Sequence, residues 1–114
     1  MGQGQDGQFR IDDASASGVV VVTGEIDLHT APRLRETLLG HLTNDDRHLT
    51  VDLSGVTFID STGLSVLIAG LRRARSLGGD LRLRAPSRQT YKVLELTKLT
   101  EVFAIDHAED EVGT

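Results

Sequence analysis

The side chain with the clearest potential for chemistry is Ser61, which stands in the block Asp60-Ser61-Thr62-Gly63-Leu64. The block follows a predicted strand and precedes apolar residues at helical spacing, so it lies at a junction of loop and helix. At such a junction the Ser61 hydroxyl is exposed, close to unpaired backbone N–H groups and to the Asp60 carboxylate. A simpler role is also open, because Asp60, Ser61 or Thr62 would serve equally well as the N-cap of the helix.

Several catalytic patterns are missing from the sequence. A hydrolase nucleophile at Ser61 would require Gly-x-Ser-x-Gly, and Ile59 occupies the place of the first glycine. The four histidines lack the spacing of metal ligands, so no metal site is predicted, and His29 is expected to contact a partner instead. Gly24 and Gly63 belong to no glycine-rich phosphate loop, so neither a dinucleotide nor a nucleoside triphosphate is expected as a cofactor.

A second group of polar residues is expected beside Ser61. The segment Glu25-Ile26-Asp27 follows a run of four valines, just as the Ser61 block follows the segment HLTVDL. Working residues of open α/β sheets gather where parallel strands end, so Asp27 and Ser61 share that end if their strands are neighbours. Glu25, Asp27 and Asp60 would also supply the acids of a receiver-like phosphoaspartate domain with bound Mg²⁺. That alternative is weaker, because no adjacent acidic pair closes the first strand and no lysine follows a late strand in a position to bind the phosphoryl group.

The elements that must position these residues alternate along the chain in the order β-β-α-β-α-β-α-β. Helices are predicted to begin near Thr30, Ser61 and Pro86, each with apolar residues at helical spacing or a capping residue at its start. The predicted strands cover residues 9–11, 19–22, 48–53, 80–84 and 101–105, with residues 54–60 as a link. The valine run predicts a strand that is buried on both faces. The order predicts a single α/β domain with a mainly parallel central sheet, an N-terminal edge hairpin and helices packed on the sheet.

Composition narrows the classes of function. The chain has 114 residues, which suits one domain, and it has no cysteine for a disulfide or a thiolate site. Three Phe, one Tyr and no Trp exclude an aromatic stacking surface for single-stranded nucleic acid. The net charge of −5 disfavours direct binding to nucleic acid or to membranes, and no apolar run spans a bilayer. We therefore expect a cytoplasmic protein.

The charge is unevenly distributed along the chain. Residues 1–60 hold ten acids and four bases, whereas residues 72–98 hold eight bases and two acids. These segments form either two faces of opposite potential or ordinary solvated surfaces.

Four segments together resemble the STAS domain of bacterial anti-sigma factor antagonists, also called anti-anti-sigma factors. They are GEIDLHTAPRLRETL (24–38), VDLSGVTFIDSTGLSVLIAGLRRAR (51–75), LRLRAP (81–86) and LTKLTEVFAI (96–105). The resemblance implies a STAS domain over residues 8–107, preceded by a disordered leader at 1–7 and followed by an acidic tail at 108–114.

The resemblance also implies a phosphorylation switch with no catalysis of its own. Ser61 matches the family's phosphate acceptor, and Asp27 matches its nearby acid. The unphosphorylated form would bind an anti-sigma factor that is also a serine kinase, freeing a sigma factor, and a PP2C-type phosphatase would reset the switch. The partner-binding residues expected on this basis are Glu25, Asp27, His29, Asp60, Ser61, Thr62 and Gly63. A phosphate at the helix start would accept hydrogen bonds from the N–H groups of Thr62 and Gly63.

Two other functions remain as alternatives. Similar domains serve as interaction modules in lipid-transport or stress-sensing complexes, and the receiver-like domain is the more distant possibility. The single-domain length and the intact Asp60-Ser61 pair favour the sigma-pathway switch.

Overall fold

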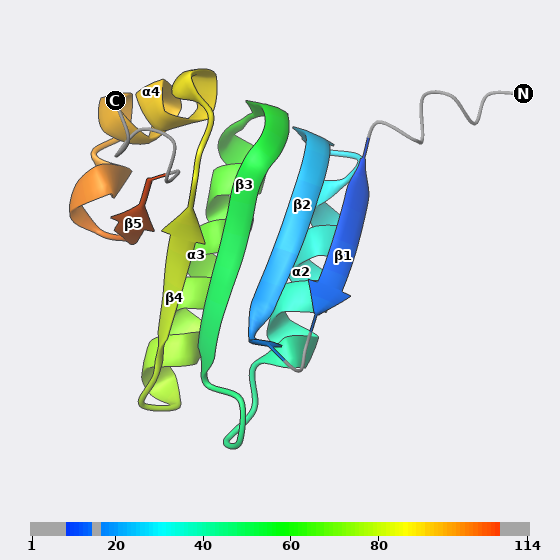
Figure 1. Ribbon diagram of the computed structural model, residues 1–114, viewed down its shortest axis with the longest axis vertical. Helices are drawn as coiled ribbons and strands as arrows, with labels where there is room; N and C mark the ends of the chain where they lie inside the picture. The colour runs from blue at the N-terminus through cyan, green and yellow to red at the C-terminus, as the bar shows by residue number, and fades with distance from the viewer. Residues whose placement is uncertain (1–8, 15–16, 108–114) are drawn as a thin grey trace, which may run out of the picture.

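The computed structural model describes residues 9–14 and 17–107 (Figure 1). The predicted leader (1–7) and acidic tail (108–114) lie outside the described residues. The strands are β1 (Arg10–Ala14), β2 (Val19–Ile26), β3 (His48–Ile59), β4 (Asp80–Arg84) and β5 (Ala104–Asp106). The helices are α2 (Ala31–His41), α3 (Ser61–Ser76) and α4 (Arg88–Leu96), with a short 3₁₀ turn, η2 (Leu99–Glu101).

One five-stranded sheet holds all the described strands, in the order β1-β2-β3-β4-β5. The β1–β2 pair is antiparallel and forms the edge hairpin, while β2, β3, β4 and β5 run parallel to one another. This arrangement confirms the predicted α/β domain with a mainly parallel sheet.

The core lies between the sheet and helices α2 and α3, which cover one of its faces (Figure 1). Burial alternates along β2: Val20 and Val22 are fully buried, whereas Val19 and Val21 are half-buried. The prediction that this valine run is buried on both faces was therefore wrong. Helices α2 and α3 pack against one face only, so alternate valines point away from them.

Strands β2 and β3 are both longer than predicted. The predicted link at residues 54–60 continues β3 up to Ile59, and Glu25 and Ile26 belong to β2 rather than following it. Gly55, which favours a link in sequence, is needed for strand pairing. A Cβ atom there would lie 2.6 Å from the Cγ2 atom of Thr23, the residue paired with it on β2. The last strand is shorter and later than predicted, because Leu99–Glu101 form the 3₁₀ turn.

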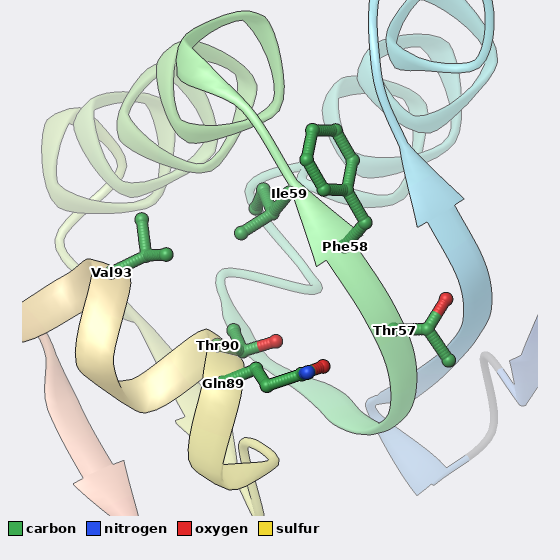
Figure 2. A pocket seen from close by; sticks show the side chains of 6 residues that line it. All are labelled: Thr57, Phe58, Ile59, Gln89, Thr90 and Val93. Carbon is green, nitrogen blue, oxygen red and sulfur yellow. The ribbon is translucent and has the colours of Figure 1, made fainter.

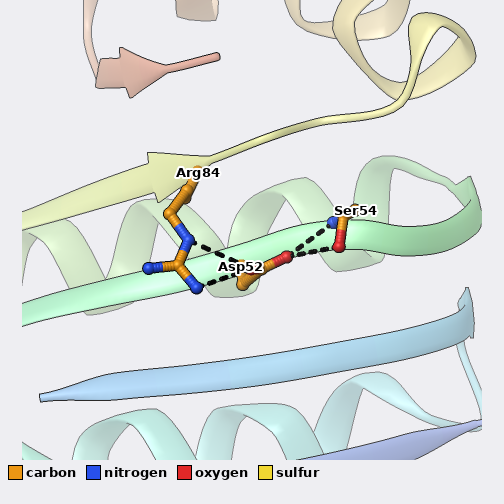
Figure 3. A network of polar contacts seen from close by, with 3 residues as sticks. All are labelled: Asp52, Ser54 and Arg84. Carbon is orange, nitrogen blue, oxygen red and sulfur yellow. Dashed lines mark hydrogen bonds and ion pairs between the residues drawn. The ribbon is translucent and has the colours of Figure 1, made fainter. Parts of the chain in front are cut away.

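A polar network joins β3 and β4 (Figure 3). Arg84 donates from Nε and Nη2 to Asp52 Oδ2 at 3.0 and 2.9 Å. Asp52 Oδ1 accepts from the Ser54 backbone N–H at 2.8 Å and from the Ser54 hydroxyl at 2.7 Å. Burial by itself would raise the pKa of Asp52, but the Ser54 hydrogen bonds and the Arg84 guanidinium lower it below its usual value.

Candidate functional site

The two segments that carry the predicted site residues meet at the carboxyl end of the sheet, where β2 and β3 finish. Ile26 and Ile59, the last residues of these parallel strands, are paired in register. The backbone N–H of Asp60 donates to the carbonyl of Ile26 at 3.2 Å, which ties the two segments together beyond the strands. The structure therefore brings the Asp27 and Ser61 segments to one end of the sheet.

Asp60, rather than Ser61 or Thr62, caps helix α3. Its Oδ1 atom accepts from the backbone N–H groups of Thr62 at 2.9 Å and Gly63 at 3.1 Å. Ser61 is the first residue of the helix and is exposed, and its hydroxyl forms no hydrogen bond with the described residues. The cap thus leaves the serine hydroxyl accessible from solvent.

This cap corrects one expectation about an anion at the helix start. The N–H groups of Thr62 and Gly63 already donate to the Asp60 carboxylate, so they are not free for a phosphate on Ser61. Because Asp60 is the adjacent residue, a phosphate there would add negative charge beside a carboxylate.

Gly63 lies in the interior, although we predicted it as part of a partner contact. A Cβ atom at this position would lie 2.6 Å from Ile26 Cγ2 and 2.8 Å from Ile59 Cγ1. The missing side chain allows the first turn of α3 to pack directly on the ends of β2 and β3. Its role in the site is therefore to set the position of Ser61.

Asp27 holds the start of helix α2. Its Oδ1 atom accepts from the backbone N–H groups of His29 at 2.9 Å and Thr30 at 3.1 Å. Burial by itself would raise the pKa of Asp27, but these hydrogen bonds lower it below its usual value. Thr30 occupies the N-cap position as predicted, yet its hydroxyl makes no capping bond and instead donates to the carbonyl of Glu25 at 2.8 Å.

Two exposed apolar side chains at the same end of the sheet were not predicted. Leu28, in the loop before α2, is 67% exposed, and Phe58, near the end of β3, is 49% exposed. Glu25, paired with Phe58 on the neighbouring strand, and His29 are also exposed. Large exposed apolar side chains among polar ones are typical of interaction surfaces. Large apolar residues are more often buried than exposed, so no local signal marks Leu28 and Phe58 as exposed.

Phe58 also lines a small pocket between the end of β3 and helix α4 (Figure 2). The pocket has a volume of about 230 Å³. Its other lining residues are Thr57, Ile59, Gln89, Thr90 and Val93, none of which is charged.

The described residues contain no group of three or more histidine or acidic side chains arranged to hold a metal ion. Asp27 and Asp60, two of the acids that a receiver-like site would use, are each engaged at a helix start. Within the same part of the chain, no helix has the length and apolar character needed to cross a membrane.

A family model and two curated relatives are similar to this chain over most of its length. A family model described as "Mlab, STAS domain" matches residues 9–105. The anti-sigma-B factor antagonist of Listeria monocytogenes is 32% identical over 94 residues, covering 82% of this chain and 82% of the relative. The protein of that name from Bacillus subtilis is 34% identical, covering 82% of this chain and 84% of the relative.

A solved structure shows the same similarity. The crystal structure of an anti-sigma factor antagonist from Mycobacterium paratuberculosis superposes with a TM-score of 0.71 at 30% identity. The match covers 90% of this chain and 87% of that one.

Proposed function

This chain belongs to the STAS domain family, and we propose that it is an anti-sigma factor antagonist whose binding is controlled by phosphorylation of Ser61. The proposal that Ser61 is phosphorylated is supported by the arrangement of side chains at the start of α3. Asp60 takes over the capping, and the Ser61 hydroxyl is left exposed. The antagonist role is supported by relatives of similar length that bear this name.

In this proposal the unphosphorylated chain binds an anti-sigma factor that is also a serine kinase, and a sigma factor is thereby released. The kinase transfers the γ-phosphoryl group of ATP to the Ser61 hydroxyl, and a PP2C-type phosphatase removes it. The chain itself acts by binding, needs no cofactor and works in the cytoplasm. Its contact surface consists of exposed and half-buried residues at the carboxyl end of the sheet: Glu25, Asp27, His29, Asp60, Ser61 and Thr62, with Leu28 and Phe58 as apolar neighbours.

The size of the charge effect is sufficient for a switch. A phosphate adds about −1.5 to −2 charges at neutral pH. In a desolvated interface, a like-charge pair at about 4 Å costs about 4 kcal/mol at an effective dielectric constant near 20. Since about 1.4 kcal/mol corresponds to a tenfold change in affinity, one phosphate weakens binding by orders of magnitude.

The proposal is tested by co-purification from a native lysate with four baits: the wild-type chain, Ser61→Ala, Ser61→Asp and the control Ser76→Ala. Ser76 is also exposed and is the last residue of α3, at the opposite end of the helix from Ser61. We expect a soluble anti-sigma factor kinase with the wild type, Ser61→Ala and Ser76→Ala, and its loss with Ser61→Asp. Incubation with that kinase and ATP should place one phosphate on Ser61.

Three results would contradict the proposal. A phosphate mapped mainly to Thr62 would move the acceptor by one residue. An acid-labile phosphate on an aspartate would support the receiver-like alternative. Recovery of membrane ATPase subunits in place of a kinase would support an interaction module of lipid transport.

A further inference from the structure

A groove runs between helices α2 and α3 and begins beside the Ser61 block. Its first part has a volume of about 270 Å³ and is lined by residues that include Leu28, Pro32 and Thr62. Its second part has a volume of about 530 Å³ and includes Ile68 and Arg72. Arg35 and Ser65 line both parts, so the two hollows form one continuous groove.

The groove carries positive charge that no described residue neutralises through an ion pair. Arg35 and Arg72 are exposed, and neither forms an ion pair or hydrogen bond with the described residues. By contrast, Arg75, Arg82 and Arg84 pair with aspartates. None of the residues that line the groove is acidic. The groove is thus locally basic although the whole chain has a net charge of −5.

The rest of the groove is largely apolar. Ala31 and Val66 are buried at its floor, Ile68 is half-buried, and Leu28 stands at its mouth with 67% of its surface exposed. From Thr62 to Arg72 the groove follows eleven residues of α3, whose ends are about 15 Å apart at the helical rise of about 1.5 Å per residue. An apolar floor of this length between two helices suits about three turns of an amphipathic helix.

We propose that this groove binds an amphipathic helix of the anti-sigma factor, with its apolar face on the groove floor and its carboxylates paired with Arg35 and Arg72. The inference rests on the proposed function and names the kind of segment that the partner contributes. Two unpaired guanidinium groups beside an apolar surface select for acidic side chains, because each guanidinium binds a carboxylate through two parallel hydrogen bonds.

The position of Ser61 connects this groove to the switch. Ser61 and Ser65 are four residues apart on α3 and therefore lie on one face of the helix. The Ser65 hydroxyl donates to the Ser61 carbonyl at 2.9 Å, and Ser65 itself lines the groove beside Arg35. A phosphate on Ser61 places negative charge next to Thr62, which lines the first part of the groove, and there it repels the partner's carboxylates.

The test measures the affinity of the purified anti-sigma factor for the full chain carrying single charge reversals. Arg35→Glu and Arg72→Glu are compared with Arg73→Glu, a control that changes the same charge at an exposed residue next to Arg72 but outside the groove lining. Unfolding curves confirm that each variant is folded. We expect each groove variant to bind at least about tenfold more weakly, and the control to remain within about twofold of the wild type.

The outcomes separate the inference from the proposed function. If the wild type binds the anti-sigma factor and both groove variants bind equally well, the inference fails and the proposed function stands. If the wild type does not bind, the proposed function fails and the inference fails with it. Sedimentation of the chain alone supplies one further outcome: a dimer that Arg35→Glu dissociates would assign the groove to a second copy and overturn the inference.

Discussion

At the residue scale, adjacent side chains at the start of α3 have separate tasks. Asp60 accepts the hydrogen bonds that a helix start requires, and Ser61 keeps an exposed hydroxyl. If Ser61 capped the helix itself, phosphorylation would replace a structural contact. In the observed arrangement the hydroxyl can be modified without loss of the cap, which suits a residue that is modified reversibly.

Asp27 is expected to combine a structural and a binding role, and two substitutions separate them. Asp27→Ala removes the side-chain acceptor of the His29 and Thr30 N–H groups, of which only Thr30 also donates to the Asp27 carbonyl, so the free energy of unfolding should fall. Asp27→Asn retains an acceptor oxygen but removes the charge, so it should unfold close to the wild type. Urea unfolding and affinity for the anti-sigma factor are measured for both variants.

The binding role of Asp27 is expected to depend on its negative charge, and its structural role on its acceptor oxygen. We therefore expect Asp27→Asn to weaken the complex although the fold is kept. Unchanged affinity in this variant would show that Asp27 serves only the start of α2.

At the element scale, the position of Ser61 depends on how closely α3 packs on the sheet. The contact at Gly63 leaves no room for a methyl group between the helix and the ends of β2 and β3. The packing of the Gly63 backbone against the side chains of Ile26 and Ile59 therefore sets the position of the first turn relative to Asp27.

Gly63→Ala should destabilise the domain, and Gly40→Ala provides the matched control. The added methyl group at position 63 overlaps Ile26 and Ile59, which should cost about 1–3 kcal/mol. At position 40, within α2, a Cβ atom has nothing within 4 Å, and alanine should stabilise the helix by up to about 1 kcal/mol. Thermal unfolding of the two variants should shift in opposite directions. Equal behaviour would mean that α3 moves away from the sheet without cost.

At the scale of the whole molecule, β3, β4 and β5 are joined by carboxylate–guanidinium pairs. Asp52 pairs with Arg84, and Asp106 pairs with Arg82 at 2.6 Å. The hydrogen bonds from Arg82 lower the pKa of Asp106 below its usual value, and the pKa of Asp52 is also lowered, by the contacts with Ser54 and Arg84. These pairs link the stability of the sheet to pH.

Acidification should therefore reduce stability in a defined range. A carboxylate whose pKa is lowered in the folded state stabilises it fully above the unfolded pKa, which is 3.8 for aspartate. That contribution is lost as the pH falls below about 4 towards the folded pKa. The free energy of unfolding is measured from pH 6 to pH 2.5, and Asp52→Asn should show a smaller decrease than the wild type. An identical decrease in both proteins would assign the acid sensitivity to other groups.

Phosphorylation should change binding far more than it changes the fold. The positive end of α3 favours a phosphate by about 0.3–1 kcal/mol, and repulsion from Asp60 opposes it by a similar amount in water. The melting temperatures of the two forms should therefore differ by a few degrees, while their affinities for the kinase differ at least about tenfold. A melting shift beyond about 10 °C would mean that the phosphate remodels the domain instead.

Much of this architecture follows from the sequence because it depends on local patterns. The apolar spacing of Leu64, Leu67, Ile68 and Leu71 predicts α3, and the alternation in DLRLR predicts β4 with its observed bounds. The block Asp60-Ser61-Thr62 marks a helix start, and the motifs at residues 24–38 and 51–75 indicate the STAS family. These features can be predicted locally, because the spacing of apolar residues within one segment shows whether it is a helix or a strand and which of its faces is buried.

The remaining features depend on contacts between segments far apart in the chain. Asp60, Ser61 and Thr62 are all residue types that cap helices. The packing of the first turn of α3 against β2 and β3 determines that Asp60 is the N-cap. Gly55 and Gly63 favour loops when considered alone, but each is required where another segment approaches closely. The groove at Arg35 and Arg72 likewise exists only because α2 packs beside α3. Tertiary structure decides these points because a local pattern fixes which face of a segment is buried, whereas the neighbouring segment fixes what that face contacts.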